Sequence, residues 1–284
     1  MSAGETALAR RWRSTGPLPG FGLTMGVTLT WLGLIVLLPL LALLVKAAGL
    51  GAQGWWEIAS DPRVLAALKL SFGTALIAAL IDTVIGANIA WVLVRYRFPG
   101  RAALDALIDL PFALPTAVAG IALTALYAGN GWLGQWLEPL GLQVAYAPAG
   151  IVVALLFVGL PFTVRTVQPV LENLQVEHEE VSASLGASRF TTVRRVIAPQ
   201  VLPAMLTGFS LAFARGVGEY GSVIFIAGNL PYVSEIAPLL IVIKLEEFDY
   251  HGATVIAMLM LGASFAILFL VNKLQRRLAR GQAN

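Results

Sequence analysis

The sequence contains long apolar stretches that are nearly free of charged residues. A helix that crosses the hydrocarbon core of a bilayer, about 30 Å thick, needs about 20 mostly apolar residues. Six stretches meet or approach this length: 21–45, 68–94, 102–127, 149–164, 202–226 and 253–271. The chain is 58% hydrophobic and 12% charged, whereas soluble domains are about a quarter charged. We therefore predict an all-α, polytopic membrane protein with about six transmembrane helices, and we exclude an ordinary soluble enzyme.

The first apolar stretch follows a cluster of arginines, as the apolar segment of a secretory signal peptide does. It is about 25 residues long, however, whereas the apolar region of a signal peptide has about 7 to 15 residues. We expect an uncleaved first transmembrane helix, preceded by a cytoplasmic N-terminal segment at 1–20.

Basic residues are divided unevenly between the two sides of the predicted membrane domain. Short cytoplasmic loops carry an excess of Lys and Arg. With a cytoplasmic N-terminus, fourteen of the 19 basic residues fall on the inner side: Arg10, Arg11, Arg13, Arg95, Arg97, Arg101, Arg165, Arg189, Arg194, Arg195, Lys273, Arg276, Arg277 and Arg280. The outer side keeps Lys46, Arg63 and Lys244, and Lys69 and Arg215 lie at membrane depth. We therefore expect both termini to be cytoplasmic and attribute the net charge of +3 to topology, not to nucleic-acid binding.

This topology predicts a transmembrane domain at 21–272 and a basic cytoplasmic tail at 273–284. One outer segment, 229–251, contains an apolar run at 236–243 that is too short to span a bilayer. We expect this run to lie on the outer face or to dip into it.

The longest predicted cytoplasmic segment, 168–199, has the pattern of two helices joined by a hinge. Five residues follow one another at intervals of three or four positions, which is typical of one face of an amphipathic helix. They are Leu171, Leu174, His178, Val181 and Leu185. Gly186 stands where a left-handed C-cap is expected, and Ser188 can cap a second helix. The apolar stripe of that second helix is Phe190, Val193, Val196 and Ile197. Pro199 follows where the next transmembrane helix is expected to begin.

An apolar ridge on a short cytoplasmic hairpin suggests docking into a groove of another protein. The alternative is a loop that lies flat on the inner leaflet. The spacing of residues in this segment favours docking. In order, the segment contains Glu180-Val181-Ser182, three further residues, Gly186, nine further residues and Val196-Ile197-Ala198-Pro199. This run resembles the EAA signature of ABC importer permeases, Glu-Ala-Ala-x3-Gly-x9-Ile-x-Leu-Pro, with the glutamate, glycine and proline in register. The resemblance implies that the hairpin contacts an ATPase through Glu180, Ser182, Leu185, Gly186, Ala187 and Pro199.

Other motifs narrow the resemblance within the ABC importers. They lie at 95–101 (RYRFPGR), 109–120 (DLPFALPTAVAG), 161–169 (PFTVRTVQP), 218–221 (GEYG) with 224–229 (IFIAGN), and 246–250 (EEFDY). In combination they are similar to those of sulfate/thiosulfate permeases, although molybdate permeases share the glutamate-aromatic-glycine element and the paired Leu-Pro. The resemblance implies a type I ABC importer permease of the MetI-like fold in a bacterial inner membrane.

The same resemblance implies partners. They are a sister permease (CysW-like), two copies of a cytoplasmic ATPase (CysA-like), a periplasmic sulfate/thiosulfate-binding protein and the lipid bilayer. The sequence has no Gly-x4-Gly-Lys-Ser/Thr phosphate loop. ATP and Mg would therefore be bound by the partner ATPase, and this chain would be a non-catalytic subunit without a cofactor of its own.

Ionisable residues inside the predicted spans are candidate pathway residues, because charges at membrane depth are costly. Arg215 and Glu219 are four residues apart and can form an ion pair, either as a structural brace or as a transient stop for an anion. Lys69 can snorkel to the outer interface or contact the anion. Asp82 has no partner that the sequence identifies, and since it would repel a dianion in the pathway, we expect it at a helix interface.

Two prolines interrupt the third apolar stretch. Pro111 and Pro115 follow Asp105 and Asp109, and they should break or kink the helix and free carbonyl groups. Two interpretations are open for this break: its backbone forms part of a gate, or it only packs against neighbouring helices. No metal site is expected, because His178 and His251 are predicted to lie on opposite sides of the membrane.

Three alternative functions remain. One is a permease for molybdate or another oxyanion. A second is a secondary anion transporter, which is disfavoured because the sequence has no inverted repeat. A third is a membrane-embedded hydrolase or transferase, for which no Ser/His/Asp constellation, metal-ligand spacing or pair of catalytic carboxylates is found.

Overall fold

The computed structural model describes residues 21–175 and 177–282, with the backbone alone described at 274 and 276–282. Segment 1–20, with Arg10, Arg11 and Arg13, and the last two residues of the predicted tail lie outside the described residues. The described residues form helices joined by turns, without a strand among them. The predicted all-α class is therefore confirmed.

Five helices are long and apolar enough to cross a membrane: Phe21–Ala48, Pro62–Arg95, Pro148–Asn173, Arg189–Val217 and Tyr250–Lys273. These correspond to five of the six predicted spans. The remaining predicted span, 102–127, is not among these long helices. That stretch consists of α6 (Arg101–Ile108), α7 (Leu110–Ala113) and α8 (Thr116–Tyr127).

The prolines explain why the third stretch is broken. Pro111 lies in the first turn of α7, where its missing N–H is tolerated. Pro115 precedes α8 and holds Leu114 in an extended conformation, with ψ 136°, because the proline ring clashes with a helical preceding residue. The expected break at these prolines is confirmed.

The chain divides into two compact units, one up to Gly54 and one from Trp55. The first unit contains one continuous apolar helix, formed by α2 (Phe21–Leu32), the π turn η1 (Gly33–Leu37) and α3 (Leu38–Ala48). None of the residues of α2 and η1 is buried. A helix that is apolar all round and exposed within its own chain is suited to lipid or to a protein partner. Helix α4 (Gly51–Ala59) follows it.

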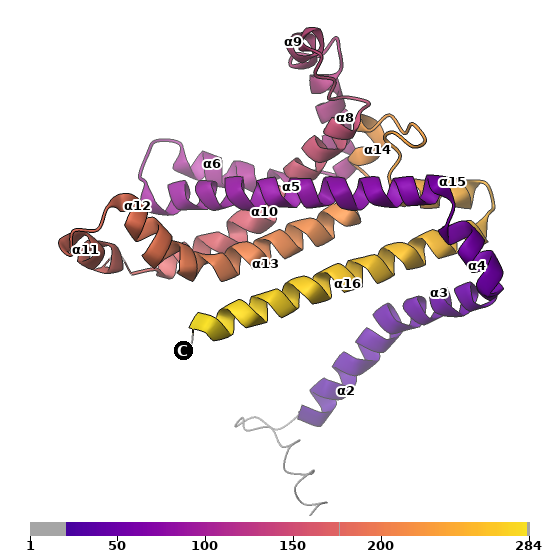
Figure 1. The fold of residues 1–284 in the computed structure, drawn as a ribbon, viewed down its shortest axis with the longest axis horizontal. Helices are drawn as coiled ribbons and strands as arrows, with labels where there is room; N and C mark the ends of the chain where they lie inside the picture. The colour runs from indigo at the N-terminus through magenta and orange to yellow at the C-terminus, as the bar shows by residue number, and fades with distance from the viewer. Residues whose placement is uncertain (1–20, 176, 283–284) are drawn as a thin grey trace, which may run out of the picture. The chain divides into compact units, whose positions relative to one another are not determined.

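Three long helices form the centre of the second unit. They are α5 (Pro62–Arg95), α10 (Pro148–Asn173) and α13 (Ala198–Val217), which pack side by side (Figure 1). Small residues allow their backbones to approach closely. A Cβ atom added to Gly86 of α5 would lie 2.8 Å from Thr163 Cβ of α10, and one added to Gly208 of α13 would lie 2.9 Å from Thr163 Cα.

Shorter elements surround these three helices. Helix α16 (Tyr250–Gln282) packs on α13, and α15 (Ala237–Glu246) packs on α16 and α5. The predicted short run is therefore α15, whose ten residues do not reach across a bilayer. The hydroxyl of Ser71 accepts a hydrogen bond of 2.8 Å from Ala237 N–H at the start of α15.

The remaining short elements are α9 (Gly134–Leu137), η2 (Glu138–Leu140) and α14 (Val223–Ile226). Helix α8 packs against α14, and α8 and α9 project away from the α5–α10–α13 layer (Figure 1). The first part of the broken third stretch, α6 and α7, stays against α10.

The fifth span differs from the predicted 202–226 at both ends. It is a continuous helix over Arg189–Val217, formed by α12 (Arg189–Thr192), the π turn η3 (Val193–Ile197) and α13. Pro199 therefore does not mark a helix start, because the π turn just before it accommodates the missing N–H without ending the helix. At the other end α13 stops at Val217, and a turn that contains Gly218 and Gly221 leads to α14.

Candidate coupling hairpin and membrane ion pairs

The hinge of the predicted hairpin has the expected geometry. Helix α11 (Glu177–Ser184) ends before Gly186, whose φ of +80° is the left-handed conformation that glycine adopts without steric cost. Ala187 N–H donates to Ser182 O at 3.1 Å across this turn. The hydroxyl of Ser188 accepts from Thr191 N–H at 3.2 Å, so the predicted cap of the second helix is confirmed.

The predicted apolar face of the first hairpin helix is wrong in its first half. Helix α10 continues to Asn173, and α11 begins only at Glu177. Leu171 and Leu174 are buried in the membrane bundle with Leu93 and Ile197, not aligned with Val181 on one helix. Packing against α5 and η3 buries these leucines, and this gain prevails over the local periodicity.

The prediction is also wrong for Ile197, which is buried in the same cluster, and Val196 is half-buried. The rest of the ridge is exposed: His178, Val181, Leu185, Phe190 and Val193. Leu185 and Phe190 are 82% and 72% exposed, and Glu180 and Gly186 are also exposed. Ser182 is held inside the hairpin, where its hydroxyl lies 2.8 Å from the hydroxyl of Thr192. Such an exposed apolar surface on a short hairpin is typical of a protein contact.

A groove of about 670 Å³ lies between α11 and the η3–α13 segment. Its lining comprises His178, Val181, Arg195, Val196, Pro199 and Gln200. Pro199 is half-buried there, and Ala187 is half-buried at the hinge. The six residues predicted to contact an ATPase are thus divided between this groove, the exposed surface of the hairpin, the hinge and, for Ser182, the inside of the hairpin.

Arg95 joins the hairpin to α5, a contact that the sequence did not reveal. Its Nη2 lies 2.6 Å from Glu179 Oε1 of α11 and donates to Leu174 O at 3.4 Å. The guanidinium also lies over the Trp91 ring, 5.5 Å from its centroid. No local spacing relates Arg95 to Glu179, so only the folded chain identifies the pair.

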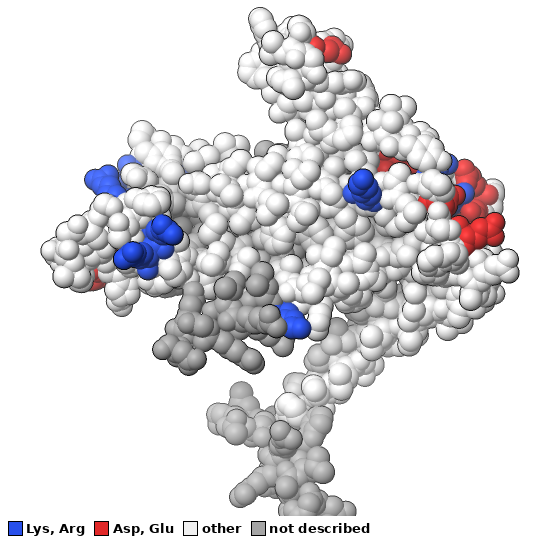
Figure 2. All heavy atoms as spheres, in the orientation of Figure 1, with Lys and Arg blue, Asp and Glu red and all other residues white. Residues whose placement is uncertain are grey.

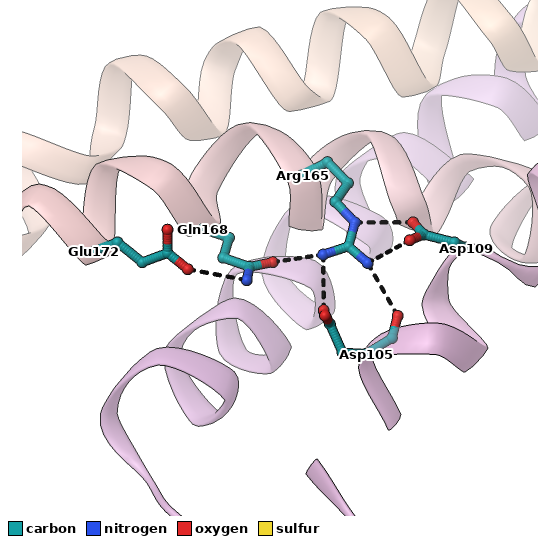
Figure 3. A network of polar contacts seen from close by, with 5 residues as sticks. All are labelled: Asp105, Asp109, Arg165, Gln168 and Glu172. Carbon is teal, nitrogen blue, oxygen red and sulfur yellow. Dashed lines mark hydrogen bonds and ion pairs between the residues drawn. The ribbon is translucent and has the colours of Figure 1, made fainter. Parts of the chain in front are cut away.

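A second network joins α6 to α10 through Arg165 (Figure 3). Its Nε and Nη2 donate to the two carboxylate oxygens of Asp109 at 2.8 and 2.6 Å, a bidentate arrangement. Nη1 donates to Asp105 Oδ1 at 2.7 Å and to Gln168 Oε1 at 2.8 Å. Gln168 Nε2 donates in turn to Glu172 Oε1 at 3.1 Å. The sequence showed that the two aspartates are four residues apart, but it did not show that Arg165 is their partner.

Arg215 and Glu219 form the predicted ion pair, with 2.5 Å between Nη1 and Oε2. The side chain of Glu219 is only 1% exposed and lies just past the end of α13. Its other oxygen, Oε1, accepts from both the backbone N–H and the hydroxyl of Ser222, each at 2.9 Å. Glu219 therefore fixes the turn between α13 and α14 while it pairs with Arg215.

The turn held by Glu219 lies against the break in the third stretch. A Cβ atom at Gly221 would overlap Thr116 Oγ1, and one at Gly120 would overlap the backbone of Ser222. Thr116 directly follows Pro115, so this proline and Glu219 belong to adjoining turns. Pro111 is elsewhere, on α7, which packs on α10 through an edge-to-face contact between Phe112 and Phe162.

Lys69 lines a different cavity, of about 560 Å³, near the start of α10. Other lining residues include Thr74, Pro148, Ala149 and Tyr232, and Lys69 is the one charged residue among those that line it. Thr74 also lines a small pocket that contains Glu219. The five predicted pathway residues are thus not gathered into one site.

Asp82 lies between α5 and α10, as expected of a residue at a helix interface. It is 2% exposed, and its Oδ2 has no hydrogen-bond partner among the described residues. Gly159 faces it so closely that a Cβ there would overlap Oδ2. Among the described residues, no group of three or more His, Cys, Asp or Glu could hold a metal ion.

The start of α5 carries another bidentate ion pair that the sequence did not predict. Arg63 Nε and Nη2 donate to the carboxylate of Glu235 at 2.8 and 2.6 Å, and Glu235 is buried. This pair fixes the loop before α15 to α5.

Comparisons with known proteins agree with this arrangement. The family model described as "Binding-protein-dependent transport system inner membrane component" matches residues 82–282. The chain is 48% identical over 263 residues to the Sulfate transport system permease protein CysT of Escherichia coli (strain K12), covering 93% of this chain and 95% of that protein. A CysT of Synechocystis sp. is 50% identical over 250 residues, covering 88% and 87%.

The fold is similar to that of a bacterial ABC transporter involved in the import of the acidic polysaccharide alginate. That structure has a TM-score of 0.74 at 13% identity and covers 97% of this chain and 99% of its own. The same kind of transporter in complex with an alginate pentasaccharide-bound periplasmic protein has a TM-score of 0.73 at 16% identity, covering 89% and 93%. The chain therefore belongs to the family of binding-protein-dependent transport system inner membrane components and has the MetI-like fold of type I ABC importer permeases.

Proposed function

We propose that this chain is a permease subunit of an ATP-driven sulfate and thiosulfate importer. The observation that carries the proposal is the identity of nearly one half, over nearly the full length, to a protein named as a sulfate transport system permease. A secondary transporter does not fit a family that depends on a binding protein. A permease for molybdate remains the alternative that the transport assay below must test.

The proposed assembly contains this chain, a sister permease (CysW-like), two copies of a CysA-like ATPase and a periplasmic sulfate/thiosulfate-binding protein. A fold neighbour was solved with a periplasmic protein bound, which supports the last of these partners. In this assembly the ATPase binds ATP and Mg. The hairpin formed by α11 and α12 docks onto it through Glu180, Leu185 and the other exposed residues of the ridge.

The distribution of charge supports a cytoplasmic hairpin and cytoplasmic termini. Figure 2 shows Lys and Arg side chains at the end of the second unit that carries α12, and Asp and Glu at the end that carries α15. The basic residues of α12 and η3 are Arg189, Arg194 and Arg195, and the acidic ones at the end of α15 and just after it are Glu246, Glu247 and Asp249. The rule that positive residues stay inside supports a cytoplasmic α12.

Lys69 and Arg215 are the proposed anion contacts of the pathway. Lys69 is exposed to its cavity, and Arg215 uses one nitrogen for Glu219 while its side chain stays 36% exposed. Thr74 lines both the cavity of Lys69 and the small pocket that contains Glu219, the partner of Arg215. The adjoining turns at Pro115 and Glu219 form the proposed gate, together with the break at Pro111. The full set of bonds on Glu219 supports a bracing role for that residue, which leaves Arg215 to meet the anion.

The function is tested by reconstituting the complete complex in proteoliposomes with the binding protein. We expect uptake of radiolabelled sulfate that requires ATP and the binding protein and that thiosulfate inhibits. Uptake of molybdate with no uptake of sulfate would replace the proposal with its alternative. Uptake that does not depend on ATP would contradict it.

The pathway residues are tested in the same vesicles. Lys69→Gln and Arg215→Gln should each lower sulfate uptake, because each removes a positive charge that attracts the dianion. Lys273→Gln, which removes an exposed charge outside the proposed pathway, is the matched control and should leave uptake unchanged. Unaltered uptake in Arg215→Gln, with assembly and ATPase activity confirmed, would exclude Arg215 as an anion contact.

A further inference from the structure

We propose that the ion pair between Arg95 and Glu179 is the positioning contact that makes α5 follow the movement of α11. This inference rests on the proposed function, because it assumes that an ATPase moves the hairpin. It concerns a different step from docking: it describes how a displaced hairpin acts on the membrane helices.

The hairpin is not joined to the bundle by an unbroken helix on its first side. Helix α10 ends at Asn173, and Leu174 has an extended backbone with ψ 115°, before α11 begins at Glu177. A non-helical link of this kind transmits displacement poorly. On the other side, α12 continues through η3 into α13 as one helix, so side-chain contacts are needed on the first side to tie α11 to α5 and α10.

Arg95 is placed to make this tie. It lies in the last turn of α5, where a positive charge is favoured by the helix dipole. Its guanidinium contacts Glu179 of α11, the carbonyl of Leu174 at the end of α10 and the face of Trp91. One side chain thus bridges three elements at the point where the hairpin leaves the bundle.

The pair is also more enclosed than an ordinary surface ion pair. The side chain of Arg95 is 16% exposed and that of Glu179 is 27% exposed, whereas the neighbouring Glu177 and Glu180 are exposed. Partial burial reduces solvent screening, so the two charges attract more strongly than they would in open water.

Helix α5 can distribute the displacement. It packs along α10 and α13, and Leu93, in its last turn, is buried with Val167 and Ile197. A movement of α11 that draws Arg95 with it therefore displaces the central helices together. Without the pair, α11 can move without drawing the end of α5 with it, only the α12–η3–α13 helix still links the hairpin to the bundle, and less sulfate is transported for each ATP hydrolysed.

The test uses the complete complex and measures sulfate uptake and ATP hydrolysis in the same proteoliposomes. Arg95→Gln and Glu179→Gln should each lower the amount of sulfate imported per ATP hydrolysed about five- to tenfold, the lower part of the range for coupling between sites. Basal ATP hydrolysis and recovery of the ATPase on the purified complex should stay at the wild-type level. Glu177→Gln removes an equal charge from an exposed position of the same helix and should not change the ratio.

The charge exchange Arg95→Glu with Glu179→Arg separates positioning from simple loss of structure. We expect the double variant to recover much of the lost ratio, because it restores the attraction with the charges reversed. An unchanged ratio in both single variants would overturn the inference, as would a loss of assembled complex that accounts for all the lost uptake. If the wild-type complex showed no ATP-dependent sulfate uptake, the proposed function itself would fail, which is a different result.

Discussion

Arg165 carries more polar contacts than any other side chain described in the bundle, and its two aspartate partners lie on α6 and at the C-cap of α6. Replacement by lysine keeps the charge but removes the planar fork that holds both oxygens of Asp109. We expect Arg165→Lys to destabilise the protein by about 1 kcal/mol, since Asp109 is about half exposed and water screens the pair. The apparent Tm of the purified protein in detergent should fall by about 2 to 4 °C.

Glu172→Gln serves as the control for this change, because Glu172 contacts only the amide of Gln168 within the network. Its apparent Tm should stay at the wild-type value. An equal shift for both variants would show that general charge loss, and not the bidentate contact of Arg165, determines stability at this site.

Asp249 predicts a dependence of stability on pH. It accepts a hydrogen bond of 2.8 Å from Gly252 N–H at the start of α16, and this bond, followed by the contact with Lys244, lowers the pKa of its carboxyl group. A pKa lower in the folded than in the unfolded state stabilises the fold above the unfolded value of about 3.9, and this contribution is lost as pH falls below it. The apparent Tm should therefore decrease between about pH 5 and about pH 3.

Asp249→Asn isolates this contribution. Asparagine can still cap the helix but does not ionise in this range. We expect a lower Tm than wild type at neutral pH and a weaker decrease in acid, whereas Asp249→Ala should lose the cap at every pH. A variant that kept the full acid dependence would assign it to other carboxyl groups.

Helix packing at the centre of the bundle depends on glycines that face other backbones. We expect Gly86→Ala to cost about 1 to 3 kcal/mol, the usual range for overpacking, because the added methyl group would lie 2.8 Å from Thr163 Cβ. Gly73→Ala on the same helix is the matched control, since a Cβ there has no atom within 4 Å. It should be neutral or slightly stabilising, as alanine is the better helix former. Thermal unfolding of the two variants measures the difference, and equal losses would exclude close packing at Gly86 as the cause.

Local signals in the sequence predicted the element boundaries that depend on single residues. Gly186, Ser188 and Pro115 act through their own backbone or through bonds within a few residues, so their effects could be read without the fold. Leu171 could not be placed in this way, because its helix assignment is decided by packing on α5 and η3. Short turns such as the one at Glu219 could not be predicted either, because an apolar run of the sequence continues across them.

The sequence did not predict the contacts between segments that are far apart along the chain. Arg165 lies 56 positions from Asp109, and Arg63 lies 172 positions from Glu235. Several acidic residues are available to each arginine, and one sequence contains no information on which of them folding brings near. The family resemblance identified the hairpin and its docking residues, but the link through Arg95 required the arrangement of α5, α10 and α11.

The orientation of the protein in the membrane can be tested because the chain has no cysteine. A single cysteine introduced at any exposed position is then the only thiol that this chain offers to a reagent. Ala183→Cys in α11 and Gln143→Cys in the segment before α10 are both exposed. They lie on opposite sides of the membrane if the basic residues of α12 and η3 are cytoplasmic.

A membrane-impermeant maleimide should therefore label Gln143→Cys from outside intact cells with a permeabilised outer membrane, and should not label Ala183→Cys. Inside-out vesicles should give the reverse pattern, provided that the hairpin is not covered by the ATPase. Stripping the ATPase from the vesicles before labelling meets that condition, and a gain in Ala183→Cys labelling on stripping would also support contact between α11 and the ATPase. Labelling of Ala183→Cys from outside intact cells would invert the topology and remove the basis for docking, because a periplasmic hairpin cannot meet an enzyme that uses cytoplasmic ATP.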